Sequence, residues 1–321
     1  MKKLLFIGLA ATAMLASCSN DETVEMAQQN AIAFDGFVNK STRATTNDDI
    51  TLANLGSIEV YGWRGDVQIF DKQAVTVATD GKGTYSPLQY WEANYTYAFE
   101  AIAPKNGEKG VTFAAAKNGG TITFVNDAET DLLYSKATDV ITPATITTEA
   151  NVSPVSFTFN HLLSRVKFTF VNGFPAKAIA KISVKDVKIS NAYKNGTITP
   201  ATTDAVWNAT DNTLSVDFVN VNATDIEAGN KEGETEHMYL IPVASPSYNV
   251  TFTVTLDQNG ATTDYEHTAT ITTGMEKGKS YNFTATLTPE NVDPENTMYP
   301  IEFTAAVGGW EDFTDNDITV E

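Results

Sequence analysis

The sequence predicts an all-β protein made of two antiparallel β-sandwiches in tandem. Strand-length runs rich in valine, isoleucine, threonine, tyrosine and phenylalanine alternate apolar and polar side chains with a period of two residues. Glycine, asparagine, aspartate and proline separate these runs at short intervals. No amphipathic helical pattern longer than a few turns lies between them, so a parallel sheet covered by helices is not expected.

The first half of the chain is expected to form one sandwich, and the polar residues 19–30 precede it without any period. The expected strands are 32–38, 58–63, 67–70, 74–78, 95–103, 111–113, 121–125 and 132–134. A tight hairpin is predicted at Asn118–Gly120, because its residues tolerate positive φ between two strand-like runs.

The stretch Thr138–Pro154 is rich in threonine, alanine and proline and shows little alternation, so a linker or long loop is predicted there. The chain has 321 residues, and domains usually hold about 100–200 residues. We therefore place a domain boundary near residue 150, with an N-terminal domain over 31–149 and a C-terminal domain over 150–321.

The second half repeats the strand-like pattern. The expected strands are 155–159, 165–171, 182–190, 214–221, 238–243, 250–256, 265–271, 281–287 and 301–307. Asn259–Gly260 is a strong turn signal, so the runs on either side of it are expected to pair as a hairpin.

The start of the chain has the pattern of a secretion signal. Lys2 and Lys3 give it a positive charge, residues 4–15 are almost wholly apolar, and two small residues lead to Cys18. A membrane-spanning helix needs about 20 apolar residues, and this run is shorter. The signal peptide is expected to cover residues 1–17.

Cys18 is the only cysteine of the sequence, so no intramolecular disulfide can form. The run Leu15–Cys18 resembles a bacterial lipoprotein processing box, in which the cysteine thiol is acylated. Acyl chains contribute about 0.8 kcal/mol per buried methylene, so the mature chain would be anchored to a membrane without spanning it. Residues 18–30 would then be a tether, and Asp21 and Glu22 resemble a signal for export to the outer surface in Bacteroides-like bacteria. The alternative is a plain signal peptide in which Cys18 happens to lie at the cleavage point.

The formal net charge of the chain is −19. Nucleic acids are bound through clustered lysine and arginine, so nucleic acid is not an expected partner. An acidic surface is consistent with a soluble exported protein.

Catalytic and metal-binding patterns are missing from the sequence. His161, His237 and His267 each stand alone, without the spacings that build transition-metal sites, so no metal or cofactor is expected. No nucleophile elbow, phosphate-binding loop or dinucleotide fingerprint occurs. We expect no enzymatic activity, and we expect His161 to be a histidine at the edge of the core with a satisfied hydrogen bond.

Three weaker patterns have a structural and a functional interpretation. The acids of Asp127–Asp131 could bind calcium, but a solvated acidic turn is the better interpretation, because the glycine and distal glutamate of an EF-hand loop are missing. Arg64–Asp66 matches the tripeptide recognised by integrins and is also a common turn between strands. Trp63, Trp91 and Trp310 could form a sugar-stacking platform, although aromatic residues of β-sandwiches usually pack in the core.

Several runs together resemble the fimbrillin family, the lipoprotein-derived pilus subunits of Bacteroides and Porphyromonas relatives. These runs are IAF at 32–34, YSPLQYW at 85–91, FTFNHLLSRV at 157–166, MYLIPV at 238–243, GKSY at 278–281 and VGGW at 307–310. The resemblance covers nearly the whole chain after the tether. It implies two transthyretin-like β-sandwiches, delivered to the outer membrane as a lipoprotein and displayed on the cell surface or in a fimbrium.

The resemblance also implies that an arginine-specific protease releases an N-terminal strand and that subunits assemble by strand exchange. Arg43 follows the strand expected at 32–38 and is the candidate cleavage site. Ile32, Phe34 and Val38 are the candidate apolar side chains of the released strand. Removing such a strand would expose an apolar groove and unpaired backbone groups, which a partner strand could fill.

The end of the chain fits a donor strand less well. After Trp310 the residues are mostly acidic or polar, and Phe313, Ile318 and Val320 are the large apolar side chains that could serve as donors. The protein is therefore expected to be a fimbrial subunit or a tip or accessory adhesin. Its expected partners are other fimbrial subunits, the outer membrane and a host or bacterial surface receptor. The alternative function is a surface glycan-binding lipoprotein of a polysaccharide-uptake system.

Overall fold

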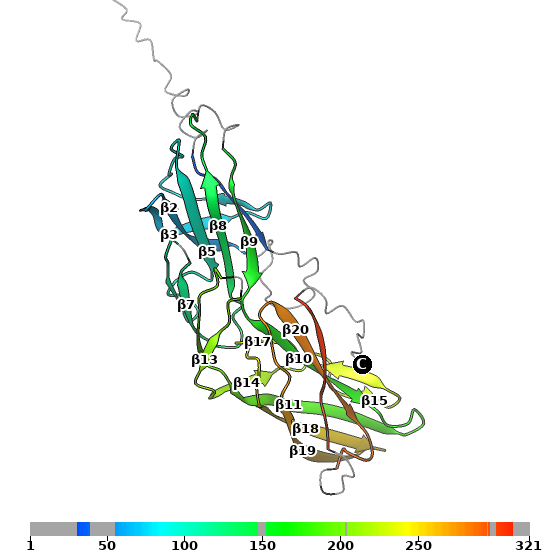
Figure 1. Ribbon diagram of the computed structural model, residues 1–321. Helices are drawn as coiled ribbons and strands as arrows, with labels where there is room; N and C mark the ends of the chain where they lie inside the picture. Colours follow the sequence, from blue (N-terminus) through cyan, green and yellow to red (C-terminus); the bar gives the residue numbers. More distant parts are fainter. Residues whose placement is uncertain are drawn as a thin grey trace, which may run out of the picture.

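The computed structural model describes residues 31–38, 55–117, 119–146, 152–202, 204–293, 295 and 300–310. Within these ranges the secondary structure consists of β-strands, which confirms the predicted all-β class. The molecule is elongated, with β2, β3, β5, β8 and β9 toward one end and β11, β18 and β19 toward the other (Figure 1). None of the described residues forms a helix that could cross a membrane.

Seven strands of the first part close into a barrel, in the order β1–β4–β3–β2–β5–β8–β9. Their bounds are β1 (Phe34–Val38), β2 (Ser57–Arg64), β3 (Val67–Val77), β4 (Lys82–Thr84), β5 (Thr96–Ala103), β8 (Leu133–Ile141) and β9 (Val155–His161). Alternate side chains of these strands fill the barrel, among them Phe34, Ile58, Val60, Phe70, Phe99 and Phe157. The barrel closes because β1 pairs with β9 on one side and with β4 on the other.

A four-stranded sheet in the order β13–β12–β7–β6 accompanies the barrel. Its strands are β6 (Val111–Ala114), β7 (Thr121–Val125), β12 (Asn195–Ile198) and β13 (Asn208–Thr210), so both halves of the sequence contribute. Apolar side chains of this sheet pack with Tyr61, Trp63 and Ile102 of β2 and β5 in one core cluster. These two strands are consequently buried on both faces, which explains their nearly continuous burial.

A buried carboxylate ties the loop between β6 and β7 to the barrel. Glu100 on β5 is 3% exposed. Its Oε1 accepts hydrogen bonds from the Gly120 N–H at 2.9 Å and from the Tyr134 hydroxyl at 2.7 Å. Burial raises the pKa of the Glu100 carboxyl, although these donors act in the opposite direction.

The second part is a sandwich of two sheets that share one apolar core. One sheet has the order β16 (Lys231–Glu234), β10 (Ser164–Asn172), β20 (Lys279–Leu287) and β21 (Thr304–Gly309), with β17 (Met238–Leu240) also paired to β10. The other has the order β14 (Leu214–Phe218), β11 (Ala180–Ala192), β18 (Tyr248–Gln258) and β19 (Ala261–Ile271), with β15 (Ile226–Glu227) paired to β11. The predicted hairpin of β18 and β19 is confirmed, with Asn259 and Gly260 at positive φ.

Strand pairing crosses the domain boundary expected near residue 150. β9 follows that residue but pairs with β1 and β8 of the barrel, and β12 pairs with β7. The expected linker also begins later than Thr138, because β8 continues to Ile141. The division into 31–149 and 150–321, and the transthyretin-like form of both parts, stay predictions.

Candidate functional site

The candidate site is the position of β1 in the barrel, which we call the β1 seat. β1 runs parallel to β9 over its five residues, with Phe34 opposite Val155 and Val38 opposite Phe159. On its other side Phe34 and Asp35 pair in antiparallel register with β4. A strand with partners on both edges contributes main-chain hydrogen bonds to each neighbour, so its removal would leave two strand edges unpaired.

Phe34 is the main apolar contact between β1 and the barrel core. Its side chain is 1% exposed. Its ring centroid lies 5.3 Å from that of Phe70, 5.4 Å from Tyr85, 5.8 Å from Phe99 and 5.7 Å from Phe157. Aromatic pairs at such distances stabilise by about 0.5–1.5 kcal/mol each beyond the burial of their area. Phe34 thus occupies a pocket made by four aromatic rings.

Gly83 on β4 allows β1 to approach closely. A Cβ added at this position would lie 2.7 Å from Cγ1 of Val75 and 3.2 Å from both Cβ and the carbonyl oxygen of Phe34. These distances are shorter than ordinary van der Waals contact. The glycine is therefore a steric requirement of the seat and not a turn signal.

The residues just before β1 are held by the segment that follows β4. The Ile32 N–H donates to the Gln89 carbonyl at 2.8 Å, and the Ile32 carbonyl accepts from the Tyr85 hydroxyl at 2.7 Å. The Ala33 carbonyl accepts from the Val155 N–H at 2.8 Å. Burial raises the pKa of Tyr85 to about 12, so the hydroxyl is a neutral donor at ordinary pH.

The β1 seat has the features needed to bind an extended strand. The seat offers a pocket for an aromatic side chain, a buried site for the aliphatic side chain two residues earlier, and backbone partners along both edges. These are the elements of recognition by strand addition, in which the backbone supplies affinity and the side-chain pockets supply specificity.

A family model described as fimbrillin-like matches residues 42–310 of the sequence. The chain belongs to this fimbrillin-like family. This confirms the resemblance drawn from the sequence motifs, and the matched residues cover most of the chain.

Three solved structures have a similar fold to this fimbrillin-like protein. A proposed cell adhesion protein from Bacteroides ovatus has a TM-score of 0.53 at 17% identity, over 88% of this chain and 98% of that chain. One from Bacteroides uniformis has a TM-score of 0.51 at 18% identity, over 87% of this chain and 99% of that chain. One from Bacteroides eggerthii has a TM-score of 0.50 at 13% identity, over 88% of this chain and 96% of that chain. At these identities the likeness concerns the fold, and no curated protein matches the chain.

The structure brings two of the candidate strand residues together. Ile32 and Phe34 are both 1% exposed and lie in the β1 seat, while Val38 pairs with β9 through its backbone. Cys18, Arg43 and the candidate donor residues lie outside the described residues, and those candidate donor residues are Phe313, Ile318 and Val320. Their predicted roles stay predictions.

The sequence motifs did not predict which residues surround Ile32 and Phe34 in the seat. Tyr85 and Gln89 belong to the run YSPLQYW that marked the family resemblance, but their contacts with Ile32 were not predicted. The ring pocket of Phe34 was likewise not predicted. A glycine between two polar residues in a short strand was the available signal for Gly83.

His161 is buried and makes the predicted hydrogen bond through Nδ1. Its Nδ1 lies 2.9 Å from Oδ2 of the buried Asp131, and its ring stacks on the Trp310 indole with 4.0 Å between ring centroids. The Tyr239 ring lies nearly parallel to the Trp310 indole, with 5.7 Å between ring centroids. This cluster fixes the end of β21 at the junction of the barrel and the sandwich.

His267 and Asp127 each have backbone hydrogen-bond partners. His267 Nε2 lies 3.0 Å from the Val292 carbonyl, and burial lowers the pKa of the imidazole. In the turn that follows β7, Oδ1 of Asp127 accepts hydrogen bonds from the backbone N–H groups of Glu129 and Thr130. Among the described residues, no group of three or more histidine, cysteine, aspartate or glutamate side chains is placed to hold a metal ion.

The remaining sequence candidates pack or pair locally. Trp63, Trp91 and Trp310 are 6%, 6% and 5% exposed, so they form parts of the core and not an exposed platform. Arg64 forms an ion pair with Glu92, and Asp66 is joined to the Lys117 ammonium at 2.7 Å. The Arg64–Asp66 turn therefore has structural partners on both of its charges.

Proposed function

We propose that this fimbrillin-like protein is a fimbrial subunit, or a tip or accessory adhesin, that assembles by exchange of strand β1. Cys18 carries the lipid that anchors the exported precursor to the outer membrane. An arginine-specific protease then cuts after Arg43, β1 leaves the barrel, and a strand of another subunit takes its place. The protein acts by anchoring, assembly and adhesion and not by catalysis.

The observation that carries this proposal is the position of Phe34. Burying a phenylalanine or isoleucine side chain contributes about 1.5–3 kcal/mol, and the four ring contacts of Phe34 add to that. An empty seat would expose these rings and two unpaired strand edges at the same time. A partner strand that restores both would therefore dissociate very slowly.

The side-chain spacing of the seat defines the incoming strand. It must present an aliphatic and an aromatic or large aliphatic side chain two residues apart, as Ile32 and Phe34 do. Ile318 and Val320 near the C-terminus have this spacing, and Phe313 lies before them. The same segment is strongly acidic, which favours a protein that accepts a strand without donating one. In that case it would be a tip or accessory subunit.

The test is limited digestion of the chain Ser19–Glu321 with an arginine-specific protease, followed by intact mass and by gel electrophoresis without boiling. A cut after Arg43 and a resistant oligomer ladder indicate a polymerising subunit, whereas the same cut without a ladder indicates a tip or accessory subunit. The matched control is Arg43→Lys, which keeps the charge and removes the recognised residue. Cleavage elsewhere with Arg43 intact would refute the strand-release mechanism.

A further inference from the structure

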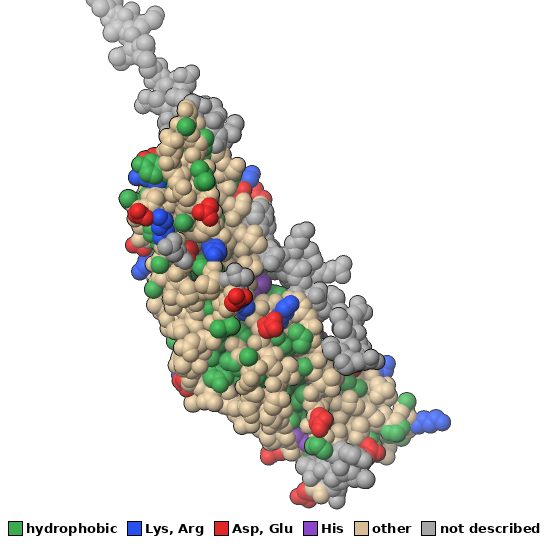
Figure 2. Space-filling model, viewed as in Figure 1, with side chains coloured by type: hydrophobic (Ala, Val, Ile, Leu, Met, Phe, Trp, Pro, Cys, Tyr) green, Lys and Arg blue, Asp and Glu red, His purple; other side chains and the backbone are tan. Residues whose placement is uncertain are grey.

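The sheet β13–β12–β7–β6, to which both halves of the sequence contribute, is called the shared sheet below. A pocket lies at the seam between this shared sheet and the sandwich, and we call it the seam pocket. It has a volume of about 790 Å³ and is lined by residues 204–209, 242–244 and 275–277 together with Tyr193. Pockets of about 300–1,000 Å³ lined mainly by apolar side chains are typical of ligand sites. Figure 2 shows apolar side chains gathered in this part of the molecule, where β13, β14 and β17 lie in the view of Figure 1.

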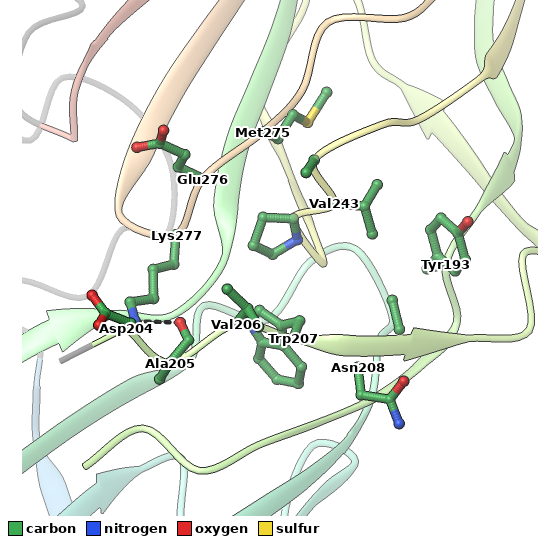
Figure 3. Close-up of a pocket in the computed structure, with 13 residues that line it drawn as sticks. Tyr193, Asp204, Ala205, Val206, Trp207, Asn208, Val243, Met275, Glu276 and Lys277 are labelled. Carbon is green, nitrogen blue, oxygen red and sulfur yellow. Dashed lines mark hydrogen bonds between the residues drawn. The ribbon is translucent and has the colours of Figure 1, made fainter. Parts of the chain in front are cut away.

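The wall of the pocket is apolar in the middle and charged at one end. Figure 3 shows Trp207, Val243 and Met275 around the centre of the pocket, with Asp204, Glu276 and Lys277 together on one side. The Lys277 ammonium donates to the Ala205 carbonyl at 2.6 Å, so it is tied to the wall. The two carboxylates give this end an excess of negative charge.

The same pocket lies beside a free strand edge. β13 is the last strand of its sheet, paired with β12 on one side, and no described strand pairs with its other side. Val206, just before β13, is 81% exposed, although it is a large apolar side chain that lines the pocket. An exposed strand edge with an apolar pocket beside it is the arrangement that binds extended peptides by strand addition.

We propose that the seam pocket binds an extended peptide segment of a partner protein, with aliphatic side chains in the pocket and a lysine or arginine beside Asp204 and Glu276. Charge complementarity selects this occupant over a second copy of the chain. Each copy carries a formal net charge of −19, so the acidic end of the pocket repels another copy and attracts a basic segment. The site is separate from the β1 seat and does not depend on strand release.

The test measures binding of fluorescent peptides to the chain Ser19–Glu321 by anisotropy. The first probe is a peptide of about ten residues that alternates valine and threonine and ends in two lysines, and the second probe carries glutamates in place of the lysines. The lysine peptide is expected to bind saturably and at least about tenfold more tightly than the glutamate peptide. No saturable binding, or equal binding of both peptides, would overturn the proposal.

Two double variants test whether the lysine peptide binds at the acidic end of the seam pocket. The double variant Asp204→Asn with Glu276→Gln is expected to weaken binding of the lysine peptide about tenfold. The matched control is Glu129→Gln with Glu266→Gln, which removes the same charge from exposed positions elsewhere and should leave the affinity unchanged. Equal loss in both double variants would show that net charge alone attracts the peptide, which contradicts a built site.

The apolar contact is tested separately. Val206→Ser is expected to weaken binding several-fold, whereas Val219→Ser, at another exposed valine, should not. Both positions are exposed, so melting temperatures should stay close to that of the unchanged chain. Light scattering of the protein alone completes the test. A dimer that Val206→Ser dissociates would identify a second copy as the occupant and overturn the peptide assignment.

Discussion

The substitution Phe34→Ala tests how much the β1 seat contributes to stability. Truncating a buried phenylalanine costs about 3–5 kcal/mol, because transfer energy is lost and a cavity remains. Phe34 is 1% exposed and contacts four aromatic rings, so the expected loss lies well inside that range, at about 4 kcal/mol.

The assay is urea unfolding of the chain Ser19–Glu321, followed by tryptophan fluorescence, because Trp91 belongs to the same barrel core as Phe34. The unfolding midpoint should fall without a large change in slope. The matched control is Val67→Ala on β3, which is 58% exposed and should change the unfolding free energy by less than about 0.5 kcal/mol. A loss below about 1 kcal/mol for Phe34→Ala would refute the assigned packing.

Substitutions at three further positions have defined outcomes. Gly83→Val should force β1 away from β4 and speed hydrogen exchange of the Phe34 amide, and unchanged exchange would contradict the close approach. Trp310→Ala should cost about 3–5 kcal/mol in urea unfolding because the indole stacks on His161, and Trp310→Phe should cost clearly less. Burial raises the pKa of Glu100, so the folded state keeps this carboxyl protonated at pH values where the unfolded chain has lost the proton. The unfolding free energy therefore falls as the pH rises from the ordinary pKa of 4.5 through the higher pKa of the folded state. Glu100→Gln should flatten that slope, and an unaltered slope would show that another group causes it.

The alternation of apolar side chains was sufficient to predict most strands and the all-β class. β18 buries every second residue from Tyr248 to Leu256, and β19 does so from His267 to Ile271, so their pattern is clear in the sequence. Two expected runs, 67–70 and 74–78, proved to be one strand, β3. Lys72 adopts positive φ within it, and the pairing with β2 shifts register nearby, so the alternation is interrupted while the strand continues.

Three short strands were not predicted from the sequence. β4, β12 and β13 have three or four residues each, too few to show a period. The shared sheet could therefore not be predicted, and with it the seam pocket beside β13. A pattern within one segment carries no information on which distant segment will pair with it.

The candidate site was predicted in part. Ile32 and Phe34 could be singled out because both lie on one face of a strand expected near the start of the folded part of the chain. The parallel pairing of β1 with β9 could not be predicted, because the pattern of short strands favoured antiparallel neighbours. The four rings around Phe34 come from four separate segments, and closure of the barrel brings them together.

The measurement that tests strand exchange most directly is strand replacement in trans. The chain Ser19–Glu321 is cut with the arginine-specific protease and incubated with a fluorescent peptide of residues 31–38, and bound label is followed by size-exclusion chromatography. If β1 is exchangeable, cut protein takes up the peptide, uncut protein does not, and a peptide with Phe34→Ala is not retained. Equal uptake by cut and uncut protein, or retention of the Phe34→Ala peptide, would contradict the claim that β1 is an exchangeable strand.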